Sequence, residues 1–405
     1  MDRSGSARAG VLVSAMLMSA APGAAEVVLT FGIEQRLQAG WNIDLSVPET
    51  GRTTGSVTRL SFSAITRTPI DSLEFTTSGV LEVENDADSG ATTANIGRPD
   101  LGLRYTREVP NAIFSAGVQY RSDDVGTFDE DLSVADLSGR RIDTSADLRL
   151  ETGRTAPLGF AISTSFRKTD YADTSDPDLI DTEIALFGVE SRLRFSEVVE
   201  SRIGLTYQRE ARADALNEVI ETGTASVGLA YLLANGTAAA DLTFLSNDEE
   251  GDRTTFVIGR TLVLPTAAVS ARLGLTNGDV GGTDIIGSLS WTQDLPNGAV
   301  DLLVERRISF DEVAVGPVAT TLFSLGFAHE INNLSSLGLS LSNEVADAPS
   351  ERFELSQVSA IYRYAFTEDW GLDSGVRYRV RRDGDGQSDS VDIFVALSRS
   401  FEIRP

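Results

Sequence analysis

The chain lacks cysteine and has one histidine among its 405 residues, and these scarcities exclude several kinds of chemistry. Without cysteine it has no disulfide framework, no thiolate zinc site and no thiolate nucleophile. Basic side chains are outnumbered 60 to 34 by acidic ones, and the formal charge of -26 argues against nucleic acid as a partner. No apolar run of about 20 residues follows the first 25 positions, so we expect no membrane-spanning helix. Hydrophobic residues still make up 41%, which is enough for a folded chain.

The first 25 residues have the pattern of a cleaved export signal. Arg3 and Arg8 precede an apolar stretch over 11–21, and small residues follow it up to Ala25. An apolar stretch of about 11 residues is too short to cross a bilayer of about 30 Å as a helix. We therefore predict that residues 1–25 form a signal peptide that is removed after Ala25.

Alternation of apolar and polar residues dominates the chain after residue 26. Between 27 and 47, odd positions such as Phe31 and Trp41 are mostly apolar, whereas the charges of Glu34 and Arg36 occupy even positions. Because successive side chains of a strand point to opposite faces, this period of two predicts a strand with one apolar and one charged face. The same separation recurs at 73–84, 142–151, 158–167 and 372–381.

Short and long connections also alternate along the chain. Turn residues mark short connections at 69–71, 110–111, 153–157, 235–236, 265–266, 296–298 and 332–333. Longer acidic connections lie between them at 85–100, 123–139, 169–181, 247–252, 277–284 and 382–388. Such alternation predicts hairpins with tight turns at one rim and loops at the other, and about 20 strands, within a range of about 18 to 22. Two stretches, 183–195 and 256–264, are apolar on both faces, so we expect a bulge, a register change or a plug contact there.

These features together resemble the Gram-negative outer-membrane β-barrel proteins of the porin-like class. The resemblance is one of architecture and covers residues 26–405 as one domain. The last strand of that class alternates and ends on an aromatic residue, as the stretch from Val391 to Phe401 does here. Two features depart from the pattern, since Arg399 interrupts the apolar face and residues 402–405 extend past Phe401.

The resemblance implies an all-β fold, an antiparallel up-and-down transmembrane β-barrel in the bacterial cell outer membrane. It also implies contact with outer-membrane lipid and lipopolysaccharide, insertion by the barrel assembly machinery, and passage of small hydrophilic solutes. A soluble β-sandwich or solenoid remains an alternative, because its strands would also alternate between a core and water.

If the apolar register faces lipid, the charged register lines the interior of the barrel. The pore-lining candidates are Arg104, Arg121, Arg149, Arg167, Arg194, Arg202, Arg377, Arg379, Arg381, Glu82, Asp147, Glu151 and Asp373. Rows of charge of this kind screen ions in channels. The alternative is that they form cross-strand ion pairs that only stiffen the wall, each contributing about 0 to 1 kcal/mol. Arg377, Arg379 and Arg381 occupy three successive inward positions and are the strongest candidates for ion selectivity.

Catalytic and metal-binding patterns are weak in this sequence. The segment that starts at Asp383 opens like an EF-hand loop, but its twelfth position is Phe394 where a bidentate Glu is needed. Outer-membrane phospholipases have a Ser two residues after their His, whereas Ile331 occupies that position after His329. We therefore expect no enzyme activity, no metal and no cofactor.

A passive, porin-like diffusion channel for small hydrophilic solutes is the function that this sequence favours. No plug domain precedes the expected barrel, so energy-coupled uptake is not expected. The alternative is a closed structural or surface-recognition barrel, without channel activity, whose acidic loops contact partners outside the cell.

Overall fold

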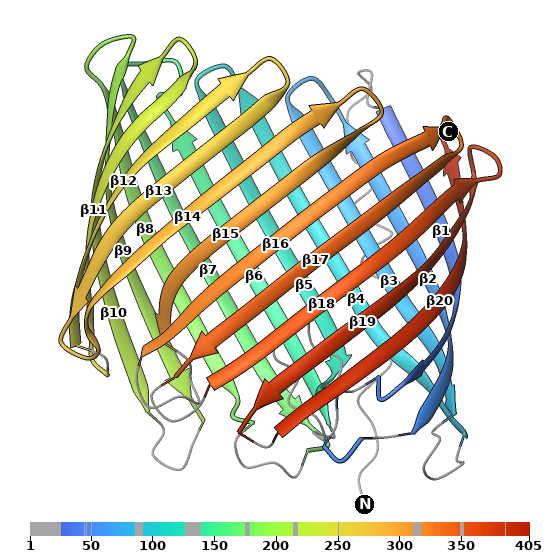
Figure 1. Ribbon diagram of the computed structural model, residues 1–405. Helices are drawn as coiled ribbons and strands as arrows, with labels where there is room; N and C mark the ends of the chain where they lie inside the picture. The colour runs from blue at the N-terminus through green and yellow to red at the C-terminus, as the bar shows by residue number, and fades with distance from the viewer. Residues whose placement is uncertain are drawn as a thin grey trace, which may run out of the picture.

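The computed structural model describes residues 26–43, 45, 47–49, 51–85, 92–125, 139–174, 179–213, 218–249, 251–310, 317–348, 352–384 and 386–405. The expected signal peptide, residues 1–25, lies outside this part, as do portions of most of the expected long connections. The described residues form one 20-stranded antiparallel sheet, which confirms the expected fold class and strand number (Figure 1). No helix in these ranges is long and apolar enough to cross a membrane.

The strands follow one another around the wall in chain order. They are β1 (Glu26–Trp41), β2 (Arg52–Arg67), β3 (Asp71–Asn85), β4 (Thr92–Val109), β5 (Ala112–Asp124), β6 (Arg140–Thr152), β7 (Leu158–Ala172), β8 (Thr182–Arg194), β9 (Val199–Arg212), β10 (Val219–Leu233), β11 (Gly236–Asn247), β12 (Gly251–Leu264), β13 (Ala267–Gly278), β14 (Gly282–Leu295), β15 (Gly298–Phe310), β16 (Pro317–Asn332), β17 (Ser335–Asp347), β18 (Arg352–Ala365), β19 (Trp370–Asp383) and β20 (Gly386–Ile403).

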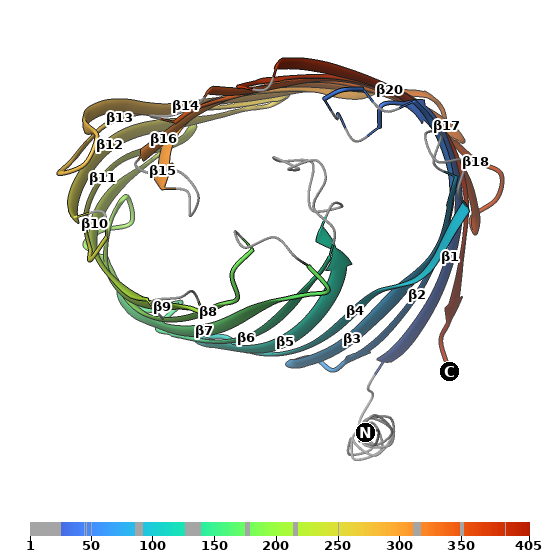
Figure 2. The same cartoon turned by 90° about the horizontal axis from the view of Figure 1, so that it is seen from below.

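Pairing of the first strand with the last closes the sheet. The register of β1 against β20 runs from Leu29 opposite Ile403 to Trp41 opposite Val391. Seen along its axis, the closed barrel is oval (Figure 2). Closure leaves no edge strand with unpaired backbone groups, which is the condition for a sheet to span hydrocarbon.

The two rims differ as the turn residues predicted. The short turns and the C-terminal end of β20 lie at the upper rim in Figure 1, and the strand ends that flank the longer connections lie at the lower rim. The turn at Gly153 depends on glycine, because its φ is +74° and a Cβ there would lie 2.3 Å from the carbonyl oxygen of Leu158.

The inward face of the sheet is fixed by the segment that follows β1. This segment lies inside the ring next to β20 in Figure 2, and the Ser388 hydroxyl of β20 donates to the Leu45 carbonyl within it, at 2.8 Å. The face of β20 that carries Ser388 therefore points inward. Residues paired across neighbouring strands lie on the same face, so the register extends this assignment around the whole barrel.

The outward face is apolar and the barrel has almost no hydrophobic core. Side chains such as Phe31, Leu37 and Leu273 are exposed on the outside, with Leu37 57% exposed. The hydrophobic residues found buried in the described ranges are Leu45, Ala64, Val80, Ile220, Val318, Ala346 and Ala396. A soluble sandwich or solenoid would bury its apolar face, so the closed sheet with exposed apolar residues excludes that alternative.

Several details differ from the expectations. Residues 183–194 and 256–264 pair without any shift of register, so the bulge or register change expected over 183–195 and 256–264 is absent from these described strands. The irregularities lie elsewhere, at Ser78/Val80 opposite β4 and at Glu330/Asn332 of β16. The connection expected over 85–100 is shorter, because β4 already begins at Thr92 and the bulge carries its polar sequence into the sheet.

Candidate functional site

The inner wall of the barrel is the candidate functional site, and register places the sequence candidates on it. The pairs Arg377–Asp392 and Arg379–Ser390 link β19 to the inward face of β20. The pairing around the sheet places on this same face Arg104, Arg121, Arg149, Arg167, Arg194, Arg202, Arg377, Arg379, Arg381, Glu82, Asp147, Glu151 and Asp373. Their common face follows from the period of two, which register preserves from strand to strand.

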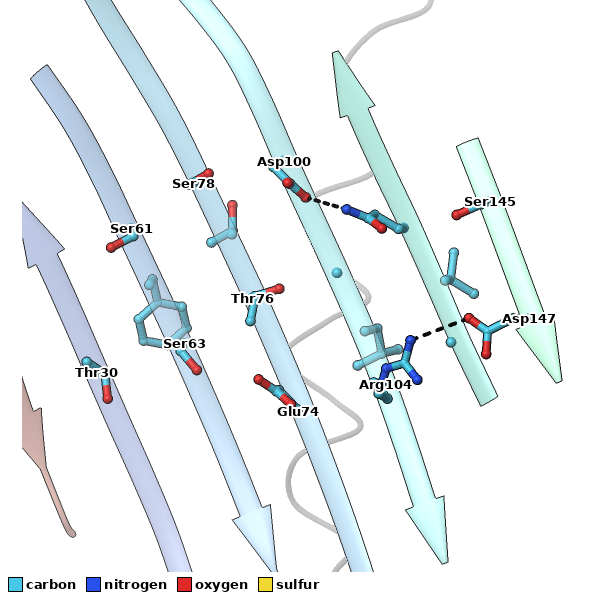
Figure 3. A pocket seen from close by; sticks show the side chains of 17 residues that line it. Thr30, Ser61, Ser63, Glu74, Thr76, Ser78, Asp100, Arg104, Ser145 and Asp147 are labelled. Atoms are coloured by element: carbon cyan, nitrogen blue, oxygen red, sulfur yellow. Dashed lines mark hydrogen bonds and ion pairs between the residues drawn. The ribbon is translucent and has the colours of Figure 1, made fainter. Parts of the chain in front are cut away.

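A polar hollow lies on this face in the part of the wall formed by β1 to β6 (Figure 3). It encloses about 410 Å³ and its hydroxyl-bearing lining residues on the inward register are Thr30, Ser61, Ser63, Thr76, Ser78 and Ser145. Charged groups at its edge are Glu74, Asp100, Arg104 and Asp147, of which Arg104 and Asp147 pair at 3.6 Å. The Arg104–Asp147 contact passes over Gly117 of β5, where a Cβ would lie 2.5 Å from Asp147 Oδ1.

Other ion pairs on the wall are open to the interior. Arg202 Nη2 lies 3.0 Å from Glu200 Oε1, and the Arg202 side chain is 64% exposed. Between β13 and β11, Arg272 and Asp241 pair at 3.2 Å, and the Arg272 side chain is 55% exposed. Pairs as exposed as these contribute about 0 to 1 kcal/mol to stability, so their guanidinium groups stay available to solutes.

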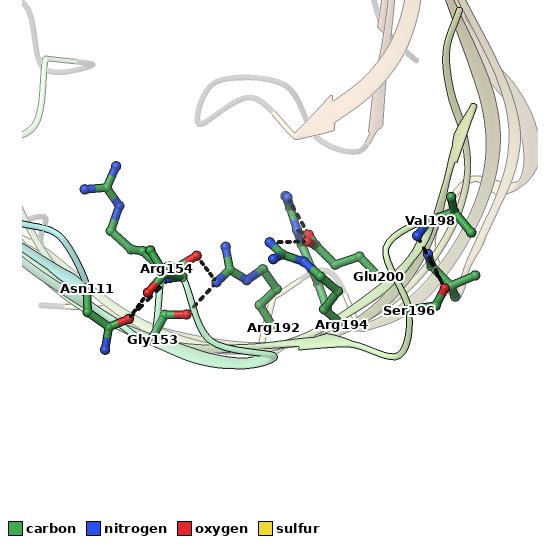
Figure 4. Close-up of polar contacts among 11 residues, drawn as sticks. Asn111, Gly153, Arg154, Arg192, Arg194, Ser196, Val198 and Glu200 are labelled. Carbon is green, nitrogen blue, oxygen red and sulfur yellow. Dashed lines mark hydrogen bonds and ion pairs between the residues drawn. The ribbon is translucent and has the colours of Figure 1, made fainter. Parts of the chain in front are cut away.

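Near the short-turn rim, arginines fix the turn between β6 and β7 (Figure 4). Arg192 donates to the carbonyl oxygens of Gly153 and Arg154, at 2.7 and 2.9 Å. Arg154 lies 2.6 Å from the Glu108 carboxylate, and this hydrogen bond raises the pKa of the Arg154 guanidinium. Arg194 and Glu200 project from the wall into the interior in the same view. The contacts of these side chains stabilise the rim, and their charges also line it.

The arginine row of β19 is engaged with the protein itself. Arg377 Nε donates to Asp392 Oδ1 at 2.9 Å, and Asp392 is only 1% exposed. Arg379 donates to the Ile43 carbonyl, and Arg381 donates to Asp383 at 2.5 Å. Because each guanidinium has a protein acceptor, the row is less available to solutes than Arg202 or Arg272 are.

Arg379 of this row binds a segment that the sequence did not reveal, the inward loop, which we define as the described residues of 42–51. Asn42 donates its side-chain amide to the Asp389 carbonyl at 3.0 Å, and Leu45 is 4% exposed. Gly40 allows the close approach, since a Cβ there would lie 2.6 Å from the Val391 carbonyl oxygen. The alternation over 27–47 had placed Ile43 and Leu45 in the first strand, but β1 ends at Trp41, and the positive φ values of Asn42 and Leu45 turn the chain out of the extended conformation.

The next candidates from the sequence are the single histidine and the acidic segments, neither of which forms a catalytic or metal-binding cluster among the described residues. His329 stacks on Phe327 at 6.0 Å between ring centroids, on the outward face of β16. Within the described residues, no group of three or more His, Asp or Glu side chains is arranged to hold a metal ion. Asp385 of the segment that resembles the start of an EF-hand lies outside those residues.

Comparison with known proteins gives fold likeness without sequence likeness. No protein-family model matches the chain, and no curated protein matches it. The siderophore receptor PirA from Pseudomonas aeruginosa is 11% identical, with a TM-score of 0.55 over 93% of this chain and 80% of that one. A variant of the ferric enterobactin receptor PfeA from the same organism is 8% identical, with a TM-score of 0.56 over 94% and 81%. The outer membrane protein OpdK of that organism is 11% identical and covers 93% of this chain and 99% of its own, at a TM-score of 0.45.

Identities this low concern the shape of the chain and not its ligands. The likeness to PirA and PfeA agrees with the closed sheet, the apolar outer face and the two unlike rims described above. The chain has the fold of a bacterial outer-membrane β-barrel, as its resemblance to that class implied.

Proposed function

We propose that this protein is a passive channel through the outer membrane for small hydrophilic solutes, which it screens by size and by its inner rows of Arg and carboxylate groups. The observation that carries the proposal is the exposure of those rows. Arg104, Arg202 and Arg272 are each more than half exposed although they point into the barrel. A lumen packed with protein would bury them, whereas a water-filled lumen keeps them solvated.

The size of the sheet supports the same function. With neighbouring strands about 4.8 Å apart and tilted by about 40°, a circular 20-stranded barrel would be about 40 Å across from backbone to backbone. Side chains fill a barrel of about 8 strands, and barrels of about 16 to 18 strands enclose an aqueous channel. Strands of 12 to 18 residues are also long enough to extend beyond an apolar band of about 25 Å.

The candidate arginines divide into two groups in this proposal. Arg104, Arg149 and Arg202 face the solvent and would contact passing ions. Arg379 would affect ion preference indirectly, because it donates to the Ile43 carbonyl of the inward loop, and the charge of Arg377 is offset by its buried partner Asp392. We also propose that the outer face contacts lipid and lipopolysaccharide and that the barrel assembly machinery inserts the chain.

Conductance in planar lipid bilayers tests the channel directly. The full chain, refolded and reconstituted, is expected to give stepwise openings and a current that falls in the presence of nonelectrolytes small enough to enter. Heat-modifiable migration on detergent gels reports barrel closure in the same preparation. A closed barrel that gives no current would contradict the proposal and favour the structural or surface-recognition role.

Ion preference tests the inner rows. Neutralising Arg104, Arg149 and Arg202 together to Gln removes three exposed positive charges and is expected to shift the reversal potential toward cation preference. The matched control is Arg306→Gln, because Arg306 lies on the outward face, where its guanidinium donates to Thr321. An equal shift in the control would mean that the inner rows do not screen the ions.

A further inference from the structure

Six inward hydroxyl groups gather in the hollow between β1 and β6. Some hydroxyls elsewhere on the inner wall pair with each other across strands, as Thr255 does with Thr276 at 2.9 Å and Ser340 with Ser359 at 2.6 Å. Within the described residues, the side chains of Thr30, Ser61, Ser63, Thr76, Ser78 and Ser145 have no such side-chain partner. Their donors and acceptors are therefore directed at whatever fills the lumen (Figure 3).

A glycine in the lining of the hollow accommodates the Thr76 side chain. A Cβ at Gly102, in the lining of the hollow, would lie 2.6 Å from the Thr76 hydroxyl oxygen. The space of about 410 Å³ falls in the lower part of the range of about 300 to 1,000 Å³ that small-molecule sites occupy.

The charge around the hollow selects among solutes. Three carboxylates, Glu74, Asp100 and Asp147, face one guanidinium, Arg104. Arg104 is paired with Asp147, and Asp100 accepts a hydrogen bond from Gln119 at 3.4 Å. Among the described residues Glu74 has no ion-pair partner, so the hollow as a whole repels anions and attracts cations.

We propose that the hollow is a binding subsite for polyhydroxylated solutes of neutral or positive charge, such as sugars and amino sugars. The proposal rests on the function proposed above, because solutes reach the hollow through the lumen. Ser and Thr hydroxyls both donate and accept hydrogen bonds, as do the hydroxyls of a sugar, and carboxylates accept from either a hydroxyl or an ammonium group. Binding should be weak, since a conducting pore must also release its solute.

Current block in single channels of the full chain tests this inference. Glucosamine, glucose and gluconate are added at equal concentrations, and saturable interruption of the current is expected in the order amino sugar, neutral sugar, anion. Thr76→Val keeps the shape and removes one hydroxyl, so it should weaken block by both sugars about fivefold. Glu74→Gln should weaken block by glucosamine to a similar extent and leave glucose unchanged.

The matched control for the hydroxyl variant is Thr292→Val, an inward residue of β14 outside the hollow. It should leave the half-blocking concentrations unchanged. Three results would contradict the subsite without contradicting the channel function. They are an open channel that none of the solutes blocks, stronger block by gluconate than by the sugars, and an equal effect of Thr76→Val and Thr292→Val on block.

Binding can also be measured without any current. Saturation-transfer NMR with glucosamine on the full chain in detergent micelles should show contact that Thr76→Val and Glu74→Gln diminish. If the barrel carries no current but binds glucosamine in this way, the proposed channel function is contradicted and the subsite is supported. If the folded barrel shows no contact with glucosamine, the subsite is contradicted.

Discussion

The buried ion pair between Arg377 and Asp392 joins β19 to β20 next to the groups that bind the inward loop, and its removal should be costly. In Asp392→Asn the carboxylate, 1% exposed, is replaced by an amide, so Arg377 loses the negative charge and one of the two oxygens that accept from its Nε. The charges of Arg377 and Asp392 both act on Arg36, so the variant leaves the repulsion between the two guanidinium groups without the carboxylate that offsets it. The contacts of the inward loop with β19 and β20 should loosen as a result.

The magnitude follows from burial. Removing one member of a buried pair costs about 3 to 5 kcal/mol, and we take the lower end, about 3 kcal/mol, because Arg377 remains 19% exposed. The matched control is Asp241→Asn, the same chemical change at a carboxylate that also pairs with an arginine on the inner wall. Asp241 and Arg272 are both largely exposed, so the control should cost about 0 to 1 kcal/mol.

Urea unfolding in lipid vesicles, followed by tryptophan fluorescence, measures the free energy of unfolding of both variants. Limited proteolysis of the native barrel detects release of the inward loop from the wall. We expect Asp392→Asn to unfold at lower urea concentration and to be cleaved faster in 42–51. A free-energy loss in Asp392→Asn no larger than that in Asp241→Asn would refute the anchoring role. A double variant, Arg377→Gln with Asp392→Asn, should lose less than the sum of the two single changes, because neither charge is then left unpaired.

Two further predictions test the sidedness of the wall and the geometry of a turn. Val227→Arg places a charge on the outward face near the middle of β10 and should lower the free energy of unfolding in vesicles by about 2 to 4 kcal/mol. Ser226→Arg, one residue away on the inward face, should lower it by less than about 1 kcal/mol. Equal costs in urea unfolding would mean that the faces are assigned wrongly. Gly153→Ala should lower stability by about 1 to 3 kcal/mol because of its positive φ and the nearby Leu158 carbonyl, whereas Gly223→Ala, with open space around its Cβ, should lower it little or not at all. Finding the two alanine variants equally stable would contradict the strain assigned to Gly153.

Much of the wall could be predicted from local patterns. A period of two assigns each side chain to a face without knowledge of its neighbours, and turn residues such as Pro110 and Asn111 mark where the chain reverses. Counting these reversals gave the strand number. The pattern was weakest where polar sequence continues into a strand, as between Thr92 and Asp100, because a register shift there accommodates residues that resemble a loop.

The partners of the candidate residues could not be predicted in the same way. Alternation alone assigned Arg377, Arg379 and Arg381 to the inward face, but it did not show that Asp392 or the Ile43 carbonyl would bind them. Nor did it show that the hydroxyls of the hollow, contributed by strands from β1 to β6, would gather around Gly102.

The sequence by itself determined the sidedness and number of the strands, because both depend on residues close together along the chain. Only the tertiary structure decided which distant groups meet. Closure places β1 beside β20, so that Asn42 reaches the Asp389 carbonyl across 347 positions of sequence. The same closure brings the Ile43 carbonyl to Arg379, next to the buried pair of Arg377 and Asp392, since burial depends on what covers a group and not on its place in a repeating pattern.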